Sequence, residues 1–168
     1  MGILDVLKVV GRNEESDECY TPVEQIKPLL NYLDKDKTYY EPTSGISSNI
    51  VQAFTDNGYK MKGSNGKDFF TCNSDDVYDG IITNPPYSKK DKFIRHCYKL
   101  EKPFALLLPV SSFQGVRRGA LFSKYGMSAL VYNHRVDFTG NGNPHFGVAW
   151  FIHGFLPPNQ IFWIDNKI

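Results

Sequence analysis

The sequence predicts an α/β protein with a doubly wound, mostly parallel β-sheet that has an antiparallel edge. Strand-like apolar runs alternate with amphipathic helical segments along most of the chain, which is typical of a parallel sheet covered on both faces. The run from Phe104 to Val110 is apolar throughout, as expected for a strand that is buried on both faces. Two late strand-like runs, 129–138 and 146–155, have little helical pattern between them and predict the antiparallel edge.

The first half of the chain predicts two helices and three strands. Thr21 and Pro22 suit the start of a helix, because Thr caps a helix N-terminus and Pro fits the first turn. Ile26, Leu29 and Leu30 follow at helical spacing. The expected elements are this helix, a strand over 38–41, a helix over 48–57 ended by Gly58, and strands over 59–62 and 78–83.

The second half predicts two more helices and the rest of the sheet. Since 168 residues suit a single domain, we expect one domain over 20–168, preceded by an N-terminal arm over 1–19. The remaining elements are helices over 90–100 and 116–125, the strand that begins at Phe104, the two late strands and a short strand over 161–164.

The composition favours a cytoplasmic protein that holds neither a metal nor a membrane anchor. The three cysteines are far apart and form no C-x-x-C pair, so neither a disulfide framework nor a zinc site is predicted. The four histidines have no metal-ligand spacing with one another or with cysteine. No apolar run approaches the ~20 residues that span a bilayer, and the first residues do not resemble a secretory signal.

The loop Asn84-Pro85-Pro86-Tyr87 follows the predicted strand over 78–83 and is the strongest functional signal. The two prolines fix their φ angles and remove two backbone donors, while their carbonyl oxygens still accept hydrogen bonds. Asn84 precedes a proline and is therefore held extended. The loop presents two rigid acceptors, the Asn84 amide oxygen and the Pro85 carbonyl, beside the aromatic ring of Tyr87.

Two acceptors in this arrangement suit a reaction at an exocyclic amino group. The lone pair of such a nitrogen is delocalised, so the amine is a poor nucleophile. Acceptors that bind its hydrogens favour a pyramidal nitrogen whose lone pair faces an electrophilic methyl group. Tyr87 can stack on the ring that bears the amine. A tight surface turn or a proline-rich ligand motif is the alternative interpretation, but the position after an apolar strand favours a site.

Two other segments leave predicted strands at the same edge of the sheet. Glu41-Pro42-Thr43-Ser44-Gly45 follows the strand over 38–41, and Asp68-Phe69-Phe70 lies beyond the strand over 59–62. Ligands of a doubly wound sheet bind outside the carboxyl ends of its strands. The sequence therefore predicts that these segments and the Asn84 loop form one site.

These segments together resemble the amino-methyltransferases, the family that includes the DNA N6-adenine methyltransferases. The Asn84 loop resembles motif IV, and Glu41 to Gly45 is similar to motif I, Asp/Glu-Pro-x-x-Gly-x-Gly. Tyr20-Thr21-Pro22 resembles the cofactor-contacting segment ahead of motif I. Asp68-Phe69-Phe70 lies where motif III supplies a carboxylate for the adenine amino group of the cofactor. Phe146 lies where an aromatic side chain packs on a flipped base, and the resemblance runs to about residue 155.

The resemblance implies a Rossmann-like class I methyltransferase fold with S-adenosylmethionine as the cofactor. It implies catalytic roles for Asn84, Pro85, Pro86 and Tyr87, and substrate contacts for Tyr87 and Phe146. It implies that the cofactor is bound by Tyr20, Thr21, Pro22, Glu41, Pro42, Thr43, Gly45, Asp68, Phe69, Phe70 and Asn84.

Two departures from the family pattern lead us to expect weak cofactor binding. Ile46 and Ser47 follow Gly45, so the second glycine of motif I is absent. Gly63-Ser64-Asn65 stands where an acidic residue usually ends the second strand and holds the ribose hydroxyls.

The net charge of +1 limits how the chain can bind nucleic acid. A protein that grips a DNA duplex by itself has a strong basic excess. Either the positive charge is concentrated on one face, or the substrate is not a long duplex. The candidates for phosphate contacts are Lys89, Lys90, Lys92, Arg117 and Arg118, although a solvated helix face has the same composition.

We therefore expect methyl transfer from S-adenosylmethionine to an exocyclic amino group, with N6 of adenine in DNA favoured over RNA. Alternatives in the same reaction class are adenine N6 or guanine N2 of RNA and the side-chain amide of a protein glutamine. A catalytically idle domain that binds cofactor or a partner, such as a small viral regulator, is the alternative from another class. Little sequence lies outside the motifs for target recognition, so we expect loose sequence selectivity or help from a second copy in a homodimer.

Overall fold

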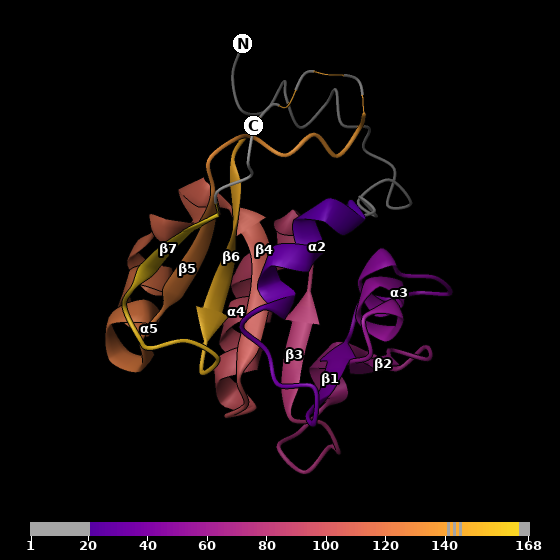
Figure 1. Cartoon of the computed structure of the whole chain (residues 1–168). Helices are drawn as coiled ribbons and strands as arrows, with labels where there is room; N and C mark the ends of the chain where they lie inside the picture. The colour runs from indigo at the N-terminus through magenta and orange to yellow at the C-terminus, as the bar shows by residue number, and fades with distance from the viewer. Residues whose placement is uncertain (1–20, 141, 143, 145, 165–168) are drawn as a thin grey trace.

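A computed structural model of the protein describes residues 21–140, 142, 144 and 146–164 (Figure 1). They form a seven-stranded sheet in the order β2-β1-β3-β4-β6-β5-β7. The strands are β1 (Thr38–Glu41), β2 (Lys60–Gly63), β3 (Gly80–Thr83), β4 (Phe104–Pro109), β5 (Ser128–Tyr132), β6 (Val148–His153) and β7 (Ile161–Ile164). The α-helices are α2 (Val23–Leu30), α3 (Asn49–Asp56), α4 (Lys90–Lys99) and α5 (Val116–Tyr125), and the 3-10 turns are η1 (Phe69–Thr71), η2 (Tyr87–Lys89) and η3 (Val110–Phe113).

The strand order makes the sheet doubly wound. β1 pairs in parallel with both β2 and β3, so the chain passes from β1 to one neighbour and then crosses to the other. β3 pairs in parallel with β4. β6 is antiparallel to β4 and β5, and β7 is parallel to β5. The expected parallel sheet with an antiparallel edge is therefore confirmed.

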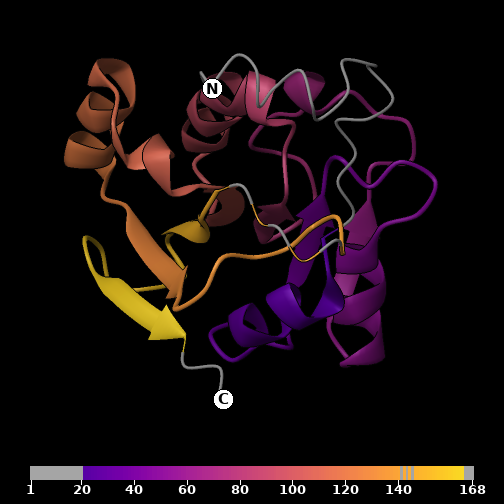
Figure 2. The same cartoon turned by 90° about the horizontal axis from the view of Figure 1, so that it is seen from above.

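Helices cover both faces of this sheet, α2 and α3 on one and α4 and α5 on the other (Figures 1 and 2). Strand β4 shows the reason, because successive side chains of a strand point to opposite faces. Ala105 and Leu107 pack in the cluster that includes α2 and α3, whereas Leu106 and Leu108 pack in the cluster that includes α4. Because both faces of β4 are apolar, the strand can bury all its side chains only between two layers of helices.

Capping residues set the helix ends. Ser48 is the N-cap of α3, and its Oγ accepts a hydrogen bond from the backbone N–H of Val51 at 3.3 Å. Gly126 follows α5 with a φ of 83°, and its N–H donates to the Phe122 carbonyl at 2.9 Å. Helix α2 begins at Val23, close to the expected start, but Pro22 occupies the N-cap position and no side chain caps the helix, so the expected capping by Thr21 was wrong.

Four expected strand ends were wrong by two or more residues. β3 begins at Gly80 and not at residue 78, β6 runs over Val148–His153 and not over 146–155, and β5 ends at Tyr132 and not at residue 138. Beyond β5 the chain turns around Asp137, whose carboxylate accepts hydrogen bonds from the backbone N–H groups of Thr139, Gly140 and Gly142. These backbone groups are thus satisfied without a strand partner.

The expected N-terminal arm over 1–19 lies outside the described residues. Among the helices that are described, none combines the length and apolar character that a membrane span requires.

We expect Leu107→Ala to lower the free energy of unfolding by about 3 kcal/mol, because it opens a cavity in the middle of the sheet. Val116, which is 93% exposed, supplies the control: Val116→Ala should change stability by less than about 0.5 kcal/mol. Urea denaturation of both variants measures the difference. A loss below about 1 kcal/mol for Leu107→Ala would contradict the burial of β4 on both faces.

Candidate active site

The carboxyl ends of β1 and β3 lie where a doubly wound sheet binds its ligands. The strand order reverses between β1 and β3, because β1 connects onward to β2 on its other side. Such a reversal is the point at which ligands bind in open α/β sheets. Glu41 ends β1 and Asn84 follows β3, so the fold brings the two strongest sequence motifs to the same place.

The carboxyl group of Glu41 joins the ends of these two strands. Glu41 is 2% exposed, and its Oε1 accepts from both the N–H and the hydroxyl of Thr43 at 2.9 Å. Its Oε2 accepts from the Ser48 hydroxyl at 3.4 Å, at the start of α3. The hydroxyls of Thr43 and Thr83 are 2.7 Å apart. Burial raises the pKa of Glu41, while hydrogen bonds from Thr83, Thr43 and Ser48 oppose that rise.

The rest of the loop after β1 is tied to the end of β2. The N–H of Ser64 donates to Ser44 Oγ at 2.7 Å, and the Ser44 hydroxyl donates to Ser64 Oγ at 3.2 Å. Gly63 permits this approach, since a Cβ there would lie 2.8 Å from Ser44 Oγ. Gly45 has a φ of 54°, in the left-handed region that favours glycine. Serine hydroxyls thus hold together the two loops that the family resemblance places around the cofactor.

Asn84 contacts the segment that precedes α2. Its Nδ2 donates to Thr21 Oγ1 at 3.1 Å. Thr21 is 4% exposed, and its carbonyl accepts from Asn49 Nδ2 at 3.0 Å, at the start of α3. An amide has its donor and its acceptor on opposite branches, so the bond to Thr21 also sets the direction of Asn84 Oδ1.

The loop after Asn84 turns directly into η2. The N–H of Lys89 donates to the Pro86 carbonyl at 2.9 Å, Pro85 is buried, and Pro86 is half-buried. The ring of Tyr87 meets that of Phe146 edge to face, with the ring centroids 5.8 Å apart. Phe146 thus lies beside Tyr87, and its expected contact with a flipped base stays a prediction.

The segment Asp68-Phe69-Phe70 has mainly structural contacts. Asp68 is exposed, and its Oδ1 accepts from the N–H of Phe70 at 3.0 Å to cap η1. Phe69 is 3% exposed and stacks on Phe93 at 5.1 Å between ring centroids. The Lys92 Nζ lies 3.7 Å from the centre of the Phe70 ring. Cofactor binding by this segment stays a prediction.

Arg118 is engaged within the protein. Its Nε donates to the Ser112 carbonyl at 2.9 Å, and a terminal nitrogen donates to the Gln114 carbonyl. Its other terminal nitrogen forms a salt bridge with Asp91 at 2.6 Å. All three nitrogens of the guanidinium already have partners, so the geometry favours a structural role over the expected phosphate contact.

Unlike Arg118, most of the other residues expected to contact phosphates have side chains open to solvent. Lys89 and Arg117 are exposed. The Lys90 Nζ donates to the Tyr87 carbonyl at 3.2 Å, so this side chain packs on the candidate catalytic loop. Of the remaining predicted site residues, Pro42 is buried, Pro22 is half-buried, and Tyr20 lies outside the described residues.

Four residues that contact the motifs were not predicted as site residues: Ser48, Asn49, Ser64 and Thr83. Thr83 could have been found, because it directly precedes Asn84, and Ser48 is recognisable as a helix cap. Nothing in the sequence marks the contacts of Asn49 and Ser64, since each depends on a segment distant in the chain. Within the described ranges, no group of three or more His, Cys, Asp or Glu residues could hold a metal ion.

Solved structures of methyltransferases resemble this chain, whereas no family model and no curated protein sequence matches it. A Listeria monocytogenes protein described as a class I S-adenosylmethionine-dependent methyltransferase aligns with a TM-score of 0.54 and 12% identity, over 95% of this chain and 69% of its own. A Pyrococcus horikoshii protein described as an RNA methyltransferase aligns with a TM-score of 0.52 and 11% identity, over 85% of this chain and 89% of its own.

A modification subunit of a type I restriction enzyme from Vibrio vulnificus aligns over 98% of this chain, with a TM-score of 0.52 and 11% identity. The chain spans about half of that subunit, 51% of its length. At these identities the likeness concerns the fold. The chain has the class I methyltransferase fold, as the resemblance in sequence implied.

We expect Glu41→Gln to change how stability depends on pH. Burial raises the pKa of Glu41 in the folded protein, so folding favours the protonated carboxyl. The stability that this preference contributes is fully present below the ordinary value of 4.5 and is lost as the pH rises through the raised pKa. Gln does not titrate, so the wild type should lose stability relative to the variant across that window.

Chemical denaturation of wild type and variant from pH 4 upward measures this difference. Glu101→Gln, at an exposed position, is the control and should show no such trend. A difference between wild type and Glu41→Gln that stays constant with pH would contradict the assignment.

Proposed function

We propose that this chain is an S-adenosylmethionine-dependent methyltransferase that alkylates an exocyclic amino group, with N6 of adenine in DNA as the favoured target. The observation that supports this most is the Asn84-Pro85-Pro86-Tyr87 loop, placed at the carboxyl end of β3 in a class I methyltransferase fold. The loop lies beside the Glu41 loop and Thr21, which belong to two of the other segments that resemble the family.

The residues present fit this cofactor in most respects. The Glu41 loop reaches an exposed Gly45, where the backbone has no Cβ to obstruct a ligand. Asn65 is exposed just beyond β2, at the position where the family has an acid for the ribose hydroxyls. A neutral amide is a weaker acceptor than a carboxylate, so we expect weak cofactor binding. When bound, the cofactor supplies a methyl group on a positively charged sulfur.

The chain's own residues would act on the amine. Asn84 Oδ1 and the Pro85 carbonyl accept its two hydrogens and thereby direct the nitrogen lone pair toward the methyl group. Their partial negative charges would also stabilise the positive charge that develops on the nitrogen as its bond to the methyl carbon forms and the methyl–sulfur bond breaks. The methylated nitrogen would then lose one proton to water. Tyr87, supported by the edge of Phe146, stacks on the base.

The choice of DNA over RNA as the substrate has weaker support than the reaction class. The fold likeness to a restriction-modification subunit supports DNA, and RNA is the second candidate because an RNA methyltransferase shows a similar likeness.

Transfer of a labelled methyl group tests the proposed function. The protein is incubated with methyl-tritiated cofactor and, separately, with single-stranded DNA, duplex DNA, tRNA and cell protein. We expect label in DNA, and Asn84→Ala should lower kcat at least about 100-fold, as removal of one preorganised polar group does elsewhere. Asn31→Ala, at an exposed position that ends α2, is the control. Absence of label from all four substrates would refute the enzyme, and a folded Asn84→Ala variant with near-normal kcat would refute its role.

Thr21 should act as a positioning residue, because its hydroxyl accepts from Asn84 Nδ2. Thr21→Val keeps the shape but removes the hydroxyl, and should lower kcat about tenfold while the cofactor Kd stays unchanged. Thr21→Ser keeps the hydroxyl and should retain kcat. Calorimetry gives the Kd and initial rates give kcat. If Thr21→Val instead weakened cofactor binding at constant kcat, Thr21 would be a cofactor contact and not a positioning residue.

A further inference from the structure

The exposed face of α4 has a row of positive charges. Residues three or four apart in a helix lie on the same face. The cations at this spacing are all exposed, and the opposite side of the helix packs its apolar residues against the sheet. The row consists of Lys89, which immediately precedes α4, Lys92, Arg95 and Lys99, and is called here the α4 basic stripe.

Within α4, no acid pairs with the cations of this stripe. Asp91 is the one acidic residue of α4, and it forms a salt bridge with Arg118 of α5 at 2.6 Å. None of the four stripe cations is in a salt bridge with another residue in the described part of the chain. The Lys92 Nζ lies over the Phe70 ring and not beside a carboxylate.

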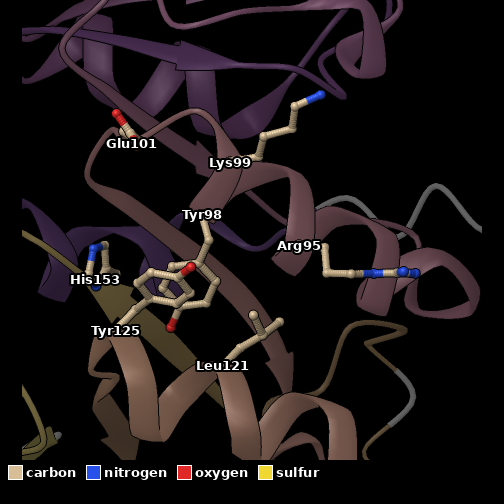
Figure 3. Close-up of a pocket in the computed structure, with 7 residues that line it drawn as sticks. All are labelled: Arg95, Tyr98, Lys99, Glu101, Leu121, Tyr125 and His153. Atoms are coloured by element: carbon tan, nitrogen blue, oxygen red, sulfur yellow. The ribbon is translucent and has the colours of Figure 1, made fainter.

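The stripe runs from the candidate catalytic loop to a pocket at the other end of α4. Lys89 belongs to η2, which begins with Tyr87 of the candidate catalytic loop. At the other end, Arg95 and Lys99 line a pocket between α4, α5 and the end of β6 (Figure 3). In the same pocket Tyr125 is 43% exposed and stacks on Tyr98, with the ring centroids 5.0 Å apart, and the Lys124 Nζ lies 4.8 Å from the centre of the Tyr125 ring.

The pocket combines aromatic rings with positive charge. Figure 3 shows the rings of Tyr98 and Tyr125 overlapping at its centre, while the side chains of Arg95 and Lys99 extend from α4 away from the rings, at the edge of the pocket. His153 lines the opposite side, and Glu101 adds one acid at the rim. Proteins that bind single-stranded nucleic acid use this combination, in which cations follow the phosphates and bases stack on aromatic rings.

We propose that the α4 basic stripe and the Tyr125 pocket bind a single strand of the nucleic-acid substrate next to the target base. The phosphates follow the stripe, and one base enters the pocket and stacks on Tyr125 in place of the Lys124 ammonium. From Lys89 to Lys99 the helix rises about 15 Å, which matches about four stacked nucleotides at ~3.4 Å each. A base paired within a duplex could not reach the ring, so the surface selects single strands or opened sites. The inference rests on the proposed function for the statement that the strand is the substrate.

Fluorescence anisotropy with a labelled, adenine-containing 12-nucleotide DNA strand tests the stripe on the whole chain, without cofactor. The double variant Arg95→Gln and Lys99→Gln should bind about tenfold more weakly at 50 mM salt, and the slope of log affinity against log salt should fall by about 1.4. The control removes the same charge from two exposed lysines in the loop between α2 and β1, Lys35→Gln and Lys37→Gln, and should bind as the wild type does.

The pocket is tested by a change that leaves charge unaltered. Tyr125→Leu should weaken binding about tenfold at every salt concentration, because stacking is lost while the phosphate contacts stay. Tyr125→Phe keeps a stacking ring and should bind normally, and thermal unfolding checks that Tyr125→Leu is folded.

The inference would be overturned if the Arg95 and Lys99 double variant kept the affinity and the salt slope of the wild type. It would also be overturned if the wild type bound single-stranded and duplex DNA with equal affinity. Failure of the proposed function gives a different result. Single-strand binding that depends on the stripe, without methyl transfer to any substrate, would refute the enzyme and support the surface. Methyl transfer by the double variant with an unchanged KM for DNA would refute the surface and support the enzyme.

Discussion

The hydrogen bonds around the buried Glu41 carboxyl hold the carboxyl edge of the sheet together. A carboxyl group is expensive to bury unless its oxygens have partners, and here Thr43, Thr83 and Ser48 supply them from the end of β1, the end of β3 and the start of α3. Thr83 directly precedes Asn84, so the same network that satisfies Glu41 also sets where the candidate catalytic loop leaves the sheet. The loop itself needs few further contacts, since its prolines restrict the backbone.

A second set of bonds adds the segment ahead of α2 to this edge. Thr21 receives one hydrogen bond from Asn84 and another from Asn49, at separations of 63 and 28 residues along the chain. Since Asn49 follows Ser48 at the start of α3, the two sets meet in one helix terminus. A displacement of α3 would therefore shift the partners of both Glu41 and Asn84, so the Glu41 loop, Thr21 and the Asn84 loop are coupled through one helix terminus.

Much of the fold was predictable because it depends on local periodicity. The strands over 38–41 and 161–164 and the helix over 116–125 have the expected bounds, since alternating or helical spacing and flanking turn residues define them. The strand expected over 129–138 ends at Tyr132, and the reason is a local interaction that the hydrophobic pattern does not reveal. Asp137 offers its own acceptors to three backbone N–H groups, so the chain leaves the sheet earlier.

For the candidate site, the sequence by itself determined which residues stand at the carboxyl ends of the strands, because strand–helix alternation places every such loop at one edge. It identified the rigid acceptors of the Asn84 loop for the same reason, since the conformation of a residue at or before proline is a local property. Only the tertiary structure decided the partners. Arg118 and Lys89 are both basic residues near the motif in sequence, yet one binds two carbonyls and a carboxylate within the protein and the other is exposed. Which of two like charges stays available for a ligand depends on groups brought near by folding, and no local pattern encodes that.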